Sequence, residues 1–133
     1  MYRKILAAVD GSEISMNAME QATELARLCE GRITAVNVLY SELTFAKSRE
    51  EVLEEQRRES KRVFREITKR AKEAGVTVET KLLEGSPAVK IADEASTGGY
   101  NLIVMGSRGK GALGSVAEKV VRAAHCPVLV VKS

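Results

Sequence analysis

The sequence predicts an open, doubly wound α/β fold in which a five-stranded parallel sheet carries helices on both faces. Five short apolar runs alternate with four segments of helical periodicity, and this βαβαβαβαβ order builds a parallel sheet. Residues 5–9 and 102–105 are the most continuously apolar runs, as expected of neighbouring central strands that are buried on both faces. A chain of 133 residues buries a sizeable core without disulfides, so residues 1–133 are expected to form one domain.

The first strand and the first helix are separated by Asp10-Gly11-Ser12. Either Ser12 or Asp10 suits the cap of a helix over about residues 13–30, in which apolar residues recur at helical spacing. Gly31 is expected to end this helix, and residues 33–39 form the second strand.

A long helix follows the second strand and ends at Gly75. Its first half, residues 49–61, is nearly all charged, and the helix carries Glu54–Arg58 and Glu66–Arg70 at i,i+4 spacing. We interpret this run of charge as a solvated helix face rather than a binding surface.

The second half of the chain contains three strands and two shorter helices. Residues 76–83 alternate apolar and polar side chains, which predicts a half-exposed edge strand. Ser86 suits an N-cap and Pro87 the first position of a helix that ends at Gly98-Gly99. After the strand at 102–105, a helix over about residues 115–124 precedes the last strand, residues 128–131.

Charge and hydropathy give no indication of a nucleic-acid-binding, exported or membrane-spanning protein. The net charge of +3 and the pI near 8.9 permit an anionic ligand but do not indicate nucleic acid. The N-terminal apolar run stops at Asp10, short of the roughly 7–15 residues of an export signal, and no run approaches the roughly 20 residues of a membrane span. We therefore expect a cytoplasmic protein without membrane contact, in which Cys29 and Cys126 are buried, reduced thiols.

The glycine-rich segment 106–115 is the strongest functional signal. It connects an apolar strand to a helix start, and this arrangement holds phosphate through free backbone N–H groups and the helix dipole. Arg108 and Lys110 add positive charge. The segment is neither a Walker loop, because Gly111 follows Gly109-Lys110, nor a dinucleotide fingerprint, because no acid ends the next strand. We predict a phosphate-containing ligand, most simply a nucleotide.

Asp10 is expected on the other wall of the crevice between the first and fourth strands. Its carboxylate suits ribose hydroxyls or a phosphate-bound Mg²⁺, and it equally suits a simple helix cap. The single histidine, His125, follows a helix end, and no Ser-His-acid group or metal cluster is evident. We name no catalytic residue and no metal ligand, and expect at most slow ATP hydrolysis.

These segments together resemble the universal stress protein family over the whole chain. The resemblance rests on the opening Lys4-Ile5-Leu6-Ala7-Ala8-Val9-Asp10-Gly11-Ser12, on Gly85-Ser86-Pro87, on the run from Leu102 to Gly109 with Gly114-Ser115-Val116, and on the ending His125-Cys126-Pro127-Val128. It implies a Rossmann-like sheet in the order 3-2-1-4-5 and an adenine nucleotide at the carboxyl ends of strands 1 and 4. The ligand it implies is ATP, with or without Mg²⁺, or ADP or AMP. The site residues it implies, to which we add Arg108 for its charge, are Ala8, Val9, Asp10, Val38, Met105, Gly106, Arg108, Gly109, Gly114, Ser115 and Val116.

The chain departs from the family's Gly-x2-Gly-x9-Gly-Ser/Thr loop. Only four residues separate Gly109 from Gly114, so five are missing, and Ala117 stands where ATP-binding relatives often carry a hydroxyl. A shorter loop is expected to draw Gly114 and Ser115 away from a triphosphate, which leaves three alternatives open: a diphosphate, a monophosphate or no ligand.

The last strand suggests an assembly. Val128, Leu129, Val130 and Val131 form a wholly apolar strand that the family order places at the sheet edge, where it can pair with a second copy. The resemblance implies a homodimer through this strand. Two functions remain open: a nucleotide-binding regulatory or stress-response protein, and a nucleotide-free dimeric interaction module of the same family.

Overall fold

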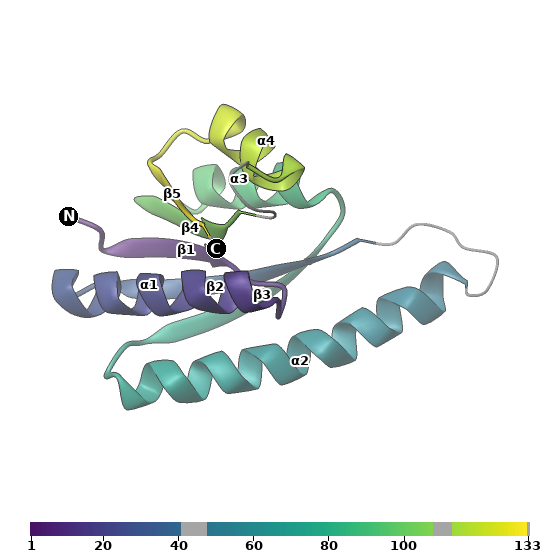
Figure 1. The fold of residues 1–133 in the computed structure, drawn as a ribbon, viewed down its shortest axis with the longest axis horizontal. Helices are drawn as coiled ribbons and strands as arrows, with labels where there is room; N and C mark the ends of the chain where they lie inside the picture. The colour runs from purple at the N-terminus through teal and green to yellow at the C-terminus, as the bar shows by residue number, and fades with distance from the viewer. Residues whose placement is uncertain (41–47, 108–112, 133) are drawn as a thin grey trace.

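The computed structural model describes residues 1–40, 48–107 and 113–132. Strands and helices alternate along the chain as the sequence predicts (Figure 1). The elements are β1 (Lys4–Ala8), α1 (Glu13–Cys29), β2 (Arg32–Leu39), α2 (Arg49–Glu73), β3 (Val78–Glu84), α3 (Pro87–Thr97), β4 (Leu102–Gly106), α4 (Ser115–Ala123) and β5 (Val128–Val131).

All strand pairs are parallel, and the sheet has the order β3-β2-β1-β4-β5. The chain moves outward from β1 through β2 to β3, and then crosses back so that β4 pairs with the other side of β1. The strand order therefore reverses between β1 and β4, and in open parallel sheets ligands bind beyond the strand ends at such a point.

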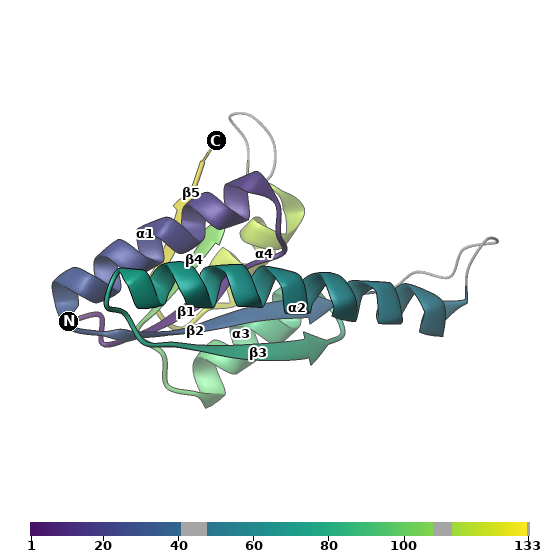
Figure 2. The same cartoon turned by 90° about the horizontal axis from the view of Figure 1, so that it is seen from below.

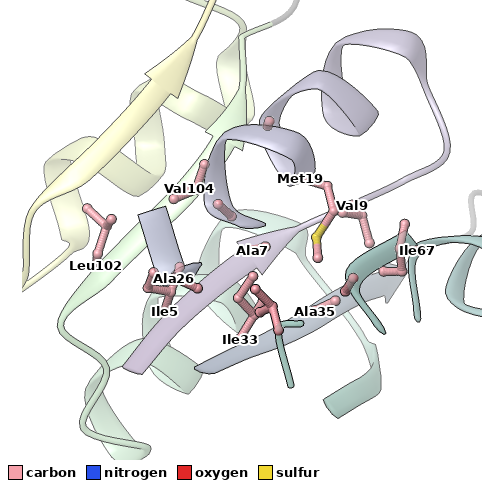
Figure 3. Close-up of a cluster of buried hydrophobic side chains, with 14 of the residues drawn as sticks. Ile5, Ala7, Val9, Met19, Ala26, Ile33, Ala35, Ile67, Leu102 and Val104 are labelled. Carbon is pink, nitrogen blue, oxygen red and sulfur yellow. The ribbon is translucent and has the colours of Figure 1, made fainter. Parts of the chain in front are cut away.

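Helices cover both faces of the sheet, with α1 and α2 on one face and α3 and α4 on the other (Figures 1 and 2). Alternate residues of β1 supply the two cores: Ile5 packs with α1 and α2, and Leu6 packs with α3 and α4. Both side chains are fully buried. Figure 3 shows the first of these cores, in which Ile67 of α2 and Met19 of α1 meet the strands.

The end of α1 differs from the sequence prediction. Glu30, not Gly31, takes the left-handed conformation that ends the helix, with φ of 55°. Gly31 is needed for space, because a Cβ there would collide with the carbonyl oxygen of Tyr2. Ser86 is the N-cap residue of α3 as predicted, but its side chain makes no capping hydrogen bond.

The charged half of α2 is largely exposed, as predicted. The two i,i+4 pairs form, with Arg58 3.9 Å from Glu54 and Arg70 2.7 Å from Glu66. Two residues of this helix half, Leu53 and Ser60, are nonetheless buried. Among the described residues, no helix combines the length and the apolar character that crossing a membrane requires.

Candidate functional site

A cavity of about 440 Å³ opens at the carboxyl ends of β1 and β4. Its walls come from six places in the chain: the end of β1 with the turn into α1, the end of β2, the first half of α2, the first turns of α3, the end of β4, and the first turn of α4. Its polar lining groups are Asp10, Ser12, Ser15, Asn37, Tyr40, Gln56, Glu59 and Ser115.

Nine of the predicted nucleotide-site residues line this one cavity. They are Ala8, Val9, Asp10, Val38, Met105, Gly106, Gly114, Ser115 and Val116. The other two, Arg108 and Gly109, lie outside the described residues. The short loop thus leaves the start of α4 at the cavity wall. The binding role of all eleven residues stays a prediction.

Asp10 lines the cavity and stabilises the turn at the start of α1, whereas the N-cap of that helix is Ser12. Asp10 Oδ1 accepts a hydrogen bond from Ser12 N at 2.9 Å, which is a turn-forming contact at the start of α1. The Ser12 hydroxyl in turn caps the helix by accepting from Ser15 N at 3.3 Å. This network fixes the exposed Asp10 side chain at the cavity wall.

The N-terminus of α4 is suited to an anion. Gly114 is its N-cap and offers no side chain, so among the described residues no side chain caps the first N–H groups of the helix. Gly114, Ser115, Val116 and Ala117 all line the cavity. By contrast, serine hydroxyls cap α1 and α2. An anionic group in the cavity would satisfy these N–H groups and interact favourably with the helix dipole.

The end of β2 offers a backbone donor and acceptor to the cavity. Val36 accepts from Val9 N at 2.9 Å, and the register between β1 and β2 ends at the pair Ala8 and Val36. Val38 is two residues farther on, so its N–H and C=O point to the same side, beyond the last β1 pair. The apolar side chains of Val36, Val38 and Met105 also line the cavity.

The α2 wall was not predicted from the sequence. Gln56 and Glu59 line the cavity, although both fall in the charged run that we interpreted as a solvated face. The available signal was Ser60, a small polar residue at position i−3 from the apolar stripe residue Val63. A serine there indicates close packing of the helix onto something polar, which proves to be Asn37.

Both cysteines are free thiols, but they are half-buried rather than buried as predicted. Burial raises the pKa of the Cys126 thiol above its usual value. Within the described ranges, no group of three or more His, Cys, Asp or Glu side chains is placed to hold a metal ion.

The family model for the universal stress protein family matches residues 1–132. The chain belongs to this family. A universal stress protein of Methanocaldococcus jannaschii is 38% identical over 141 residues, covering 99% of this chain and 83% of that relative.

Two solved structures of the family carry adenine nucleotides. A universal stress protein from Archaeoglobus fulgidus in complex with dAMP is 28% identical to this universal stress protein, with a TM-score of 0.78 and 98% of each chain covered. A universal stress protein in complex with cAMP is 25% identical, with a TM-score of 0.80 over 98% of this chain and 97% of that one.

Proposed function

We propose that this universal stress protein binds an adenine nucleotide in the cavity at the ends of β1 and β4, and acts through the bound nucleotide in regulation or the stress response. One observation carries the proposal: the start of α4 and the end of β2 line the same cavity, which also has an apolar lining. The N-cap residue of α4 makes no side-chain capping hydrogen bond. A nucleotide fits this arrangement, because its phosphate would bind at the start of α4 and its base at the end of β2.

The phosphate is placed at Gly114, Ser115 and Val116. Successive N–H groups at a helix start bind phosphate without requiring a basic side chain. Gly114 allows the phosphate to approach the backbone closely, since it carries no Cβ. Arg108 and Gly109 are proposed to complete this end of the site.

The adenine base is placed at Val38. The N–H and C=O of one residue present a donor and an acceptor side by side, which matches the acceptor N1 and the amino group at C6 of adenine. Val36, Val38 and Met105 supply apolar surface for the ring. Asp10 then lies between base and phosphate, where its carboxylate accepts from ribose hydroxyls.

The relatives support the ligand class. The family members solved with dAMP and cAMP both hold an adenine ring and a single phosphate. The loop of this chain, with four residues between Gly109 and Gly114, favours a mono- or diphosphate over ATP with Mg²⁺.

Thermal unfolding with ATP and Mg²⁺, ADP and AMP, each at millimolar concentration, tests the proposal. A ligand at 100 times its dissociation constant adds about 2.7 kcal/mol, which raises Tm by several degrees. Gly114→Val should abolish the shift, because a β-branched side chain blocks the phosphate from the backbone. If no adenine nucleotide shifts Tm, the nucleotide-free interaction module becomes the better account of this chain.

The homodimer is proposed through β5. This strand pairs with β4 on one side and forms one edge of the sheet, and Leu129 is its most exposed side chain at 36%. Val128 and Val130 instead pack against the core that α3 and α4 cover. Leu129→Lys therefore tests the interface without disturbing the core, whereas a lysine at Val128 or Val130 would disturb it. Light scattering should report a monomer for Leu129→Lys, and an unchanged dimer would place the interface elsewhere.

A further inference from the structure

The first half of α2 forms a second polar wall of the cavity. Gln56 and Glu59 are three residues apart on this helix, so their side chains share a face, and both line the cavity. Glu59 brings a carboxylate to a site in which Asp10 already supplies one.

Three contacts fix α2 around Glu59. The Gln56 side chain binds both backbone groups of Tyr40, accepting from its N–H at 3.0 Å and donating to its carbonyl at 2.6 Å. Asn37 Nδ2 donates to the hydroxyl of the fully buried Ser60 at 2.6 Å. Val63 packs so closely on the β1–α1 turn that a Cβ on Gly11 would lie 2.9 Å from its Cγ2. These contacts thus fix the position of the α2 backbone from which the Glu59 side chain extends.

The Glu59 carboxylate lies beside the turn that carries Asp10. Its Oε1 is 3.7 Å from the Cβ position of Gly11, the neighbour of Asp10 in the chain. Arg62 donates to the same Oε1 at 2.6 Å, and this hydrogen bond raises the pKa of Arg62. The Glu59 side chain is half-exposed and lines the cavity.

Two carboxylates at one end of the cavity determine what that end accepts. Ionised carboxylates are hydrogen-bond acceptors only, so they favour hydroxyl donors and repel phosphate. The start of α4, with its free N–H groups, has the opposite preference. A nucleotide would therefore lie with its phosphate at α4 and its sugar hydroxyls at Asp10 and Glu59.

We propose that Glu59 makes this site selective for ribonucleotides with free 2′ and 3′ hydroxyls, an inference that rests on the nucleotide site proposed above. The 2′-deoxy sugar of dAMP lacks one of the two donors. In cAMP the 3′ oxygen is esterified, which removes a donor and brings a negative phosphate toward two carboxylates.

Isothermal titration calorimetry of the full chain with AMP, dAMP and cAMP tests the inference. AMP should bind about tenfold more tightly than either analogue, the usual effect of one hydrogen bond to a charged group. Glu59→Gln should weaken AMP binding about tenfold and narrow the preference for AMP over the two analogues, and Asp10 should retain the remaining part of that preference. Glu66→Gln is the matched control, because it removes the ion pair with Arg70 on the same helix without touching the cavity.

The outcomes separate the two proposals. Equal affinity of the wild type for AMP and dAMP, or an unchanged preference in Glu59→Gln, would overturn the role of Glu59 while leaving the nucleotide site in place. If none of the three nucleotides releases or absorbs heat and none shifts Tm, both proposals fail. Equal urea midpoints of the Glu59→Gln and Glu66→Gln variants would show that the helix is intact.

Discussion

Replacing Gly11 with alanine should destabilise the protein through two separable effects. Gly11 has φ of 85°, a left-handed conformation that costs an alanine about 1–2 kcal/mol. The new Cβ would also lie 2.9 Å from Cγ2 of Val63, a side chain that is only 6% exposed and so has little room to move. Forcing a methyl group into such packing costs about 1–3 kcal/mol more. The expected total loss in the free energy of unfolding is about 2–5 kcal/mol.

Gly75→Ala isolates the backbone effect. Gly75 has φ of 76°, but a Cβ there would meet nothing within 4 Å. Urea unfolding should therefore show a loss of about 1–2 kcal/mol for Gly75→Ala and a larger loss for Gly11→Ala. Adding Val63→Ala to Gly11→Ala should recover part of the loss, as a positive coupling in a double-mutant cycle. Equal losses for the two glycine variants, with no coupling to Val63, would refute the close packing of α2 on the β1–α1 turn.

Three further predictions concern the core and the thiol. Ile67 is 1% exposed where α2 meets the sheet, so Ile67→Ala should lower the free energy of unfolding by about 2–5 kcal/mol. Val121 is 45% exposed, so Val121→Ala should change that free energy by no more than about 0.5 kcal/mol. Urea midpoints of the two variants give the comparison. The Ser107 hydroxyl is buried without a hydrogen-bond partner among the described residues, so Ser107→Ala should raise stability by up to about 1 kcal/mol, and a loss of that size would reveal a hidden partner. Burial raises the pKa of Cys126, so the unfolded chain loses its thiol proton first as pH rises past about 8.5, and stability should fall there. Urea unfolding at about pH 7.5 and about pH 9.5 should show this fall in the wild type and a smaller one in Cys126→Ser.

The helices and strands could be predicted from the sequence because each element is signalled locally. Continuous apolar runs indicated β1 and β4 as central strands, and the alternation after Gly75 indicated that β3 lies at an edge. The order of the strands came from the family resemblance, since parallel strands have no short-range signal that names their neighbours. The end of α1 was the local error: Glu30 adopts the left-handed conformation, while the glycine one residue later is required for its small size, where the chain passes close to Tyr2.

The two ends of the cavity differ in how far their residues could be predicted from the sequence. The reason is that one end is formed by residues close together in the chain, and the other by residues that tertiary packing brings together. The proposed phosphate end comes from one stretch of the sequence, so the residue types that it needs appear close together between Leu102 and Ala117. The proposed sugar end is assembled from the β1–α1 turn, β2 and α2, through contacts such as Asn37 to Ser60 that span 23 positions. A glutamate within a charged helix gives no sign that packing will turn it toward a cavity rather than toward water. Glu59 is set apart from Glu54 and Glu66 only by its proximity to Gly11 and by the two anchors, Gln56 and Ser60, that flank it. Specificity in this chain is therefore expected to vary with α2, while phosphate binding varies with the glycine loop.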